Sequence, residues 1–74
     1  MSLGEDRVRT KFNPSSSSAV DMLKGTIAKF IDQCEALKQD VSGDGEALRC
    51  IALAQTHAED AAMWAVKAAT AGKP

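Results

Sequence analysis

The second half of the chain is apolar on more than one side of a predicted helix, and this constrains the fold more than any other feature. One stripe at helical spacing is made almost wholly of alanine and contains Ala47, Ile51, Ala54, Ala58, Ala61, Ala65 and Ala68. A second stripe contains Leu48, Ala52, Ala62, Val66 and Ala69, flanked by Leu53 and Met63. A helix that is apolar on two sides is buried on two sides. One neighbouring helix covers only one of them, so we expect the other side to meet a second copy of the chain.

A heptad repeat predicts an earlier helix over about residues 17–39. Its apolar residues follow steps of three and four and are Val20, Leu23, Ile27, Phe30, Cys34 and Leu37, with Ile31 beside them. Gly25 is the weak helix former in this segment. Gly25 is either a weak helix former that is tolerated at the surface or a point of close approach by a backbone or ligand. The residue type alone favours the first interpretation.

A short turn over residues 40–45 separates the two predicted helices, the second of which runs over about residues 46–70. Gly43 and Gly45 break both helical patterns, and Asp44 is a candidate cap for the second helix. Because the connection is short, the helices must lie antiparallel. The sequence therefore predicts an all-α fold, an antiparallel two-helix hairpin over residues 15–74.

Residues 1–14 are predicted to form an irregular basic arm, within which we assign residues 1–3 no structural role. In an extended segment Arg7, Arg9 and Lys11 lie on one side, because the side-chain period is two. Phe12 follows, and Pro14 and the serines at 15–18 mark the start of the hairpin, with any of these serines a possible N-cap.

The chain is too short for a hairpin core to hold it alone. A chain of its length, 74 residues, buries only about 60% of the surface that its unfolded form exposes. A stabilising disulfide is not expected, because the two cysteines, Cys34 and Cys50, lie within helical patterns. This use of cysteine suits a reducing cytoplasm. With one histidine there is no metal-ligand set. Self-association into a helical homo-oligomer is the remaining source of additional stability.

Charge and hydropathy exclude several classes of function. The net charge is −1, which argues against bulk electrostatic binding of DNA. No apolar stretch approaches the roughly 20 residues of a membrane span, and the start of the chain lacks a signal pattern. No cofactor motif is present, and nothing argues for an enzyme. His57 has no evident catalytic partner, and the adjacent acids Glu59 and Asp60 are read as a solvated edge.

Binding chemistry is more plausible than catalysis. Three cations and Phe12 on one arm suit a small, planar anion, because arginine pairs with phosphate and an aromatic ring stacks on a base. The competing interpretation is that Phe12 pins the arm to the first helix and the cations are solvated, and residue types alone favour it. Trp64 likewise is either an interface residue, which is favoured, or a base-stacking wall.

Residues 53–65, Leu-Ala-Gln-Thr-His-Ala-Glu-Asp-Ala-Ala-Met-Trp-Ala, carry a family resemblance. They resemble the closing helix of the Tad hairpin proteins of phages and prophages, with the pattern Leu-Ala-x-Thr-x-x-Glu-acid-Ala-x-Met-Trp-Ala. Arg49, the pair Ile31-Asp32 and the arm at 7–14 are similar to further parts of that family. The likeness spans most of residues 7–70. It departs from the family at Phe12, Asp21 and Val66, where a ring-hydroxyl aromatic, a basic residue and an asparagine are common.

The resemblance implies an anti-CBASS sponge, a phage or prophage protein in the bacterial cytoplasm. Such proteins bind cyclic di- or trinucleotide signals without cleaving them and assemble as helical oligomers, commonly hexamers, with ligands between subunits. The implied ligand-binding residues are Arg9, Lys11, Phe12, Lys24, Arg49, Thr56 and His57. The expected oligomer interface contains Leu48, Ala62, Trp64 and Val66. The alternatives are a purely structural oligomerisation module and, more weakly, an adaptor whose arm binds a partner protein.

Overall fold

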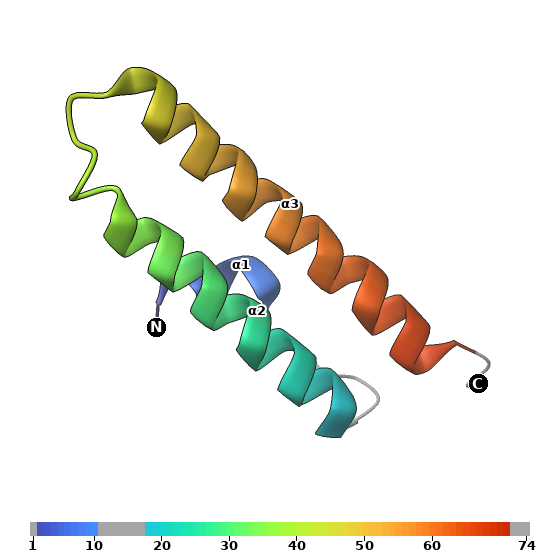
Figure 1. Ribbon diagram of the computed structural model, residues 1–74. Helices are drawn as coiled ribbons and strands as arrows, with labels where there is room; N and C mark the ends of the chain where they lie inside the picture. The colour runs from blue at the N-terminus through green and yellow to red at the C-terminus, as the bar shows by residue number, and fades with distance from the viewer. Residues whose placement is uncertain (1, 11–17, 72–74) are drawn as a thin grey trace.

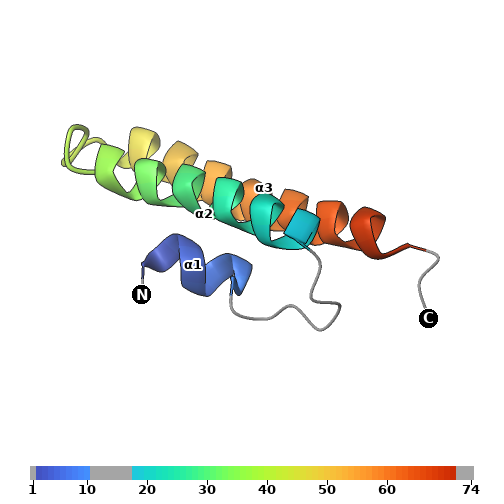
Figure 2. The same cartoon turned by 90° about the horizontal axis from the view of Figure 1, so that it is seen from below.

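The computed structural model of the protein describes residues 2–10 and 18–71, and all of its regular structure is helical. The helices are α1 (Leu3–Val8), α2 (Ser18–Leu37) and α3 (Gly45–Thr70). α2 and α3 lie side by side and antiparallel (Figure 1), and α1 lies along one face of that pair (Figure 2). The predicted all-α hairpin is confirmed, with one helix more than expected. None of the described helices is long and apolar enough to cross a membrane.

The connection between α2 and α3 follows the turn chemistry of the sequence. Gly43 has a φ of 92°, a left-handed conformation that glycine adopts without steric cost. Asp44 is the N-cap of α3, and its Oδ1 accepts a hydrogen bond from the backbone N–H of Ala47 at 3.0 Å. The expected cap is therefore confirmed.

The irregular arm was a wrong prediction for its first residues, because Leu3–Val8 form α1. Ser2 and Glu5 make a capping box, in which the Glu5 N–H donates to Ser2 Oγ at 3.1 Å and the Ser2 N–H donates to Glu5 Oε1 at 2.8 Å. This pairing stabilises a first turn that apolar periodicity could not reveal in so short a segment. Arg7 is helical, so Arg7 and Arg9 do not share a side of an extended strand.

The contact between α1 and α2 depends on two small residues. A Cβ atom on Gly4 would collide with the backbone carbonyl of Ala28, so the two backbones touch where neither residue has a large side chain. The Gly4 N–H also donates to Asp32 Oδ1 at 2.7 Å. The contact lies at Gly4, a residue that apolar periodicity passes over.

The core is small and draws on all three helices. It consists of Val8, Ala28, Ile31, Ala58 and Ala62, with Ile27 packed against it. The predicted heptad seam of α2 is only partly buried, because the buried residues of α2 are Val20, Lys24, Ala28 and Ile31. Leu23, Phe30 and Leu37 remain 36%, 46% and 45% exposed. α2 turns a face with small Ala28 toward α1 and α3, which leaves the outer half of the seam on the surface.

The inner face of α3 also differs from the predicted alanine stripe. Ile51 and Ala58 are buried as expected, whereas Ala61 and Ala68 are exposed. The missed residue is Gln55, which is 1% exposed and donates from Nε2 to the Ile31 carbonyl at 3.1 Å and to Glu35 Oε1 at 3.0 Å. A buried amide is tolerated here because both bonds satisfy it.

Candidate functional site

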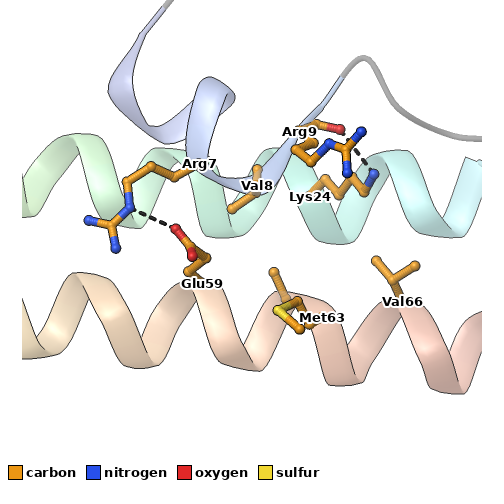
Figure 3. Close-up of a pocket in the computed structure, with 8 residues that line it drawn as sticks. Arg7, Val8, Arg9, Lys24, Glu59, Met63 and Val66 are labelled. Carbon is orange, nitrogen blue, oxygen red and sulfur yellow. Dashed lines mark hydrogen bonds and ion pairs between the residues drawn. The ribbon is translucent and has the colours of Figure 1, made fainter.

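A pocket of about 380 Å³ opens where α1, α2 and α3 meet (Figure 3). Its size falls in the range of small-molecule sites, about 300–1,000 Å³. Basic, acidic and apolar side chains from all three helices line it: Arg7, Val8, Arg9, Lys24, Glu59, Ala62, Met63 and Val66. The C-terminal end of α1 forms one wall, so the pocket exists only because this short helix is docked.

Lys24 is the most constrained cation of the pocket. It is 5% exposed, and its Nζ donates to the backbone carbonyl of Arg9 at 2.9 Å. Burial, and then the positive charge of Arg9, lower the pKa of Lys24, while Asp21 opposes the shift. A buried ammonium with a second cation nearby gains from an incoming anion, because the anion offsets both effects.

Arg9 ends α1 in a strained conformation that aims its carbonyl at Lys24. Its φ is 56° and its ψ is 56°, the left-handed region that a non-glycine residue enters at a cost of about 1–2 kcal/mol. The Arg9 N–H donates to Asp6 O at 3.3 Å, and the Thr10 N–H donates to Glu5 O at 3.1 Å. These bonds and the Lys24 ammonium hold the turn, and Figure 3 shows the Arg9 side chain beside Lys24. Sequence reasoning selected both residues, and the structure brings them together.

Arg7 and Glu59 close the other end of the pocket. Arg7 Nε donates to Glu59 Oε1 at 2.7 Å, which ties α1 to α3. The two side chains are 26% and 38% exposed. The interpretation of Glu59 as a solvated edge was therefore wrong. Glu59 and Met63 were absent from the predicted site, and Arg7 was considered among the cations of the arm but not among the implied ligand residues. The Ser2–Glu5 capping signal could have indicated that Arg7 lies on a helix.

Three predicted ligand residues lie away from this pocket. Arg49 pairs with Glu46 near the turn, with Nε 3.1 Å from Oε1, and it precedes Glu59 by ten residues, about 15 Å along α3. Thr56 and His57 are exposed, and neither lines the pocket. His57 lies two residues after buried Gln55, about 200° around the helix. Lys11 and Phe12 lie outside the described residues.

The predicted interface residues occupy three different environments. Ala62 is 4% exposed and packs in the core of the chain itself, so it offers almost no surface to a second copy. Leu48 and Val66 are half-buried, and Val66 lines the pocket. Trp64 is 62% exposed, with Lys67 Nζ 5.1 Å from its ring centroid. The α3 stripe reserved for another subunit is thus partly covered by α1, the helix that the sequence did not predict.

Apolar surface is nevertheless extensive on the outer side of α2. A shallow groove of about 420 Å³ is lined by Ala19, Met22, Leu23, Thr26 and Ile27. Phe30 and Leu37 continue the exposed apolar side chains along the same helix. Among the described residues, no group of three or more His, Cys, Asp or Glu side chains is placed to hold a metal ion.

Comparison with known proteins places the chain in a family. No curated protein and no solved structure matches it. The sequence model of one family, described as the Acb2/Tad1 hairpin domain, matches residues 5–70. This range begins within α1 and ends at the last residue of α3, so it contains the whole pocket. The protein belongs to the Acb2/Tad1 hairpin-domain family.

Proposed function

We propose that the protein binds and sequesters cyclic oligonucleotide second messengers, cyclic dinucleotides first, and so protects a phage or prophage from CBASS immunity. The family match supports anti-CBASS activity of this kind. The observation that carries the proposal is the pairing of buried Lys24 with Arg9 at one end of the pocket. Two cations over an apolar floor suit a phosphate joined to a flat base.

Sequestration requires no catalytic step, so the proposal includes none. A sponge lowers the free concentration of a signal by binding it in proportion to its own abundance. The pocket residues need only supply charge complementarity and apolar contact, the roles that Lys24, Arg9, Val8 and Met63 fit. The residues outside the described ranges, Lys11 and Phe12, stay part of the proposed ligand set.

We propose further that the protein acts as a homo-oligomer in the cytoplasm of the infected cell. Eight large hydrophobic side chains of the described residues are at least 36% exposed, more than a small monomer usually leaves in contact with water. Seven of them lie on α2 and α3 and include Phe30 and Trp64, and the eighth, Leu3, lies on α1. The same surface supports a second candidate function, a purely structural oligomerisation module.

Calorimetry separates these functions. Purified protein is titrated with 3′,3′-cyclic GMP-AMP and with related cyclic di- and trinucleotides. Sequestration predicts saturable binding that Lys24→Met weakens at least tenfold, because removing a cation from a buried anion site forfeits more than about 1.4 kcal/mol. Lys29→Met is the matched control, since Lys29 is on α2 but exposed and does not line the pocket. No binding of any cyclic nucleotide by an oligomeric protein would leave the structural module as the function.

A further inference from the structure

The two ends of the pocket carry opposite chemistry. Figure 3 shows Arg9 and Lys24 above Val66 at one end, and the Arg7–Glu59 pair at the other, with Met63 between them. Glu59 and Val66 are seven residues apart on α3, about 10 Å along the axis. This separation is comparable to the length of one nucleotide from its phosphate to the far edge of its base.

A phosphate group does not fit equally well at both ends. The Glu59 carboxylate repels it, whereas the Arg9 and Lys24 cations attract it. A bound nucleotide therefore places its phosphate beside Arg9 and Lys24. Its base then lies along Met63, with its outer edge facing Glu59. The carboxylate is the one acidic group that lines the pocket within the described part of the chain.

Glu59 is held in place with acceptor capacity remaining. Arg7 Nε occupies one site on Oε1 at 2.7 Å, and a carboxylate offers about four lone-pair sites. The pair fixes the orientation of the carboxylate, because Arg7 is itself carried on docked α1. A rigid carboxylate with spare lone pairs selects a ligand edge that presents hydrogen-bond donors, and it disfavours an edge that presents lone pairs.

We propose that Glu59 is a specificity-determining residue that selects guanine-containing cyclic dinucleotides, with Arg7 as its positioning residue. This inference rests on the proposed function. The Watson–Crick edge of guanine presents two adjacent donors, N1–H and N2–H₂, which a carboxylate accepts together. Adenine presents the N1 lone pair beside a single N6 amino group, and uracil presents one N–H between two carbonyls. A half-buried carboxylate left facing lone pairs disfavours those ligands, because its own lone pairs then lose hydrogen bonds to water without gaining a donor.

The competing explanation is that Glu59 serves only to hold α1 against α3 through its ion pair with Arg7. Loss of a purely structural ion pair weakens the binding of every ligand to the same extent. Loss of a carboxylate that contacts the base changes the ratio of the affinities for different bases. The informative variant is Glu59→Gln, which keeps the shape and one acceptor but adds a donor. A carboxamide pairs with adenine through one donor and one acceptor. The variant therefore reduces the preference for guanine or reverses it.

The experiment measures cyclic di-GMP and cyclic di-AMP binding by calorimetry on the full chain, wild type and Glu59→Gln. The wild type is expected to prefer cyclic di-GMP by about ten- to a hundredfold, and Glu59→Gln to lose at least tenfold of that ratio. Asp60→Asn is the control, because it makes the same charge change at the next, exposed residue of α3. It should leave the ratio unchanged.

Each outcome decides between separate claims. Equal affinity of the wild type for both ligands, or an equal loss for both in Glu59→Gln, overturns the assignment of Glu59 and leaves sequestration intact. Binding of neither cyclic di-GMP, cyclic di-AMP nor cyclic GMP-AMP overturns the proposed function itself. If Glu59→Gln unfolds, Arg7→Gln provides the second test, because freeing the carboxylate must also lower the ratio.

Discussion

The backbone N–H of Gly4 donates to Asp32 Oδ1 at 2.7 Å, and this bond lies where α1 rests directly on the backbone of Ala28. Gly4 does not line the pocket, yet the pocket wall formed by Arg7, Val8 and Arg9 depends on the docking of α1. Six residues form this helix, too few to be stable in isolation. The contact at Gly4 therefore links local packing to the geometry of a site about one helical turn away.

Gly4→Ala should weaken the docking of α1 on α2 and so disturb the pocket wall that α1 forms. The added methyl group meets the Ala28 carbonyl, a backbone atom that cannot move aside cheaply. We expect a loss of about 1–3 kcal/mol in the free energy of unfolding, the usual cost of overpacking. The free energy of cyclic dinucleotide binding should be reduced by at least as much as the free energy of unfolding. Urea unfolding and calorimetry measure the two effects, and unchanged ligand affinity would show that α1 does not form the site.

Gly25→Ala should have the opposite effect on stability. Nothing lies within 4 Å of a Cβ at Gly25, which sits inside α2. Alanine in a helix interior is favoured over glycine by about 0.5–1 kcal/mol. The surface interpretation of Gly25 fits this environment. A raised urea midpoint with unchanged assembly mass is the expected result, and a loss of stability would indicate a close neighbour such as another subunit.

Periodicity and turn chemistry were sufficient for the hairpin. Apolar spacing indicated α2 and α3, and Asp44 with Gly43 indicated the turn between them. The same method failed for α1, because six residues contain too few turns to show a period. It also chose the outer seam of α2, since Leu23 and Phe30 are more hydrophobic than Ala28, although the small residue is the one that lets α1 approach.

The pocket was predictable only in part, for a related reason. Arg9 and Lys24 could be selected because anion binding needs cations. Their meeting depends on a left-handed residue and a buried ammonium, which no local pattern indicates. Arg7 and Glu59 are 52 residues apart, and their pairing follows from the docking of α1. Glu59 resembled a solvated acid as long as its neighbour across the pocket was unknown.

Gln55→Leu should change both stability and the titration of Glu35. The Gln55 amide, and then Lys38, donate hydrogen bonds that lower the pKa of Glu35 from its ordinary 4.5. A lowered folded-state pKa stabilises the fold above the unfolded value, and this contribution is lost as pH falls through the folded value. The variant should bring the Glu35 pKa closer to 4.5 and make unfolding less sensitive to acid below that pH. Carboxyl NMR titration is the direct measurement, with Gln33→Leu, exposed on α2, as control.

Ligand affinity should weaken as pH rises through the lowered pKa of Lys24. Burial and the charge of Arg9 lower this pKa in the free protein, and a bound phosphate must raise it, because the anion stabilises the ammonium. Binding therefore takes up protons at alkaline pH. Calorimetry in buffers of different ionisation enthalpy measures that uptake. Lys24→Met should abolish it, and proton release by the wild type would contradict a phosphate at Lys24.

Phe30→Ser should lower the assembly mass without unfolding the chain. Phe30 is 46% exposed and lies between Leu23 and Leu37, one heptad from each, and both of these are more than a third exposed. Burying such a side chain against another subunit contributes about 1.5–3 kcal/mol, so replacing it with serine should shift the association equilibrium by at least tenfold. Sedimentation equilibrium measures the mass, and circular dichroism checks that helicity is retained. Gln33→Ser is the control, because it places the same serine at an exposed polar residue of α2 and costs more helix propensity than Phe30→Ser does. If the wild type sediments as a single chain, the exposed heptad does not join subunits, and assembly is removed from the proposed function while the pocket within one chain remains.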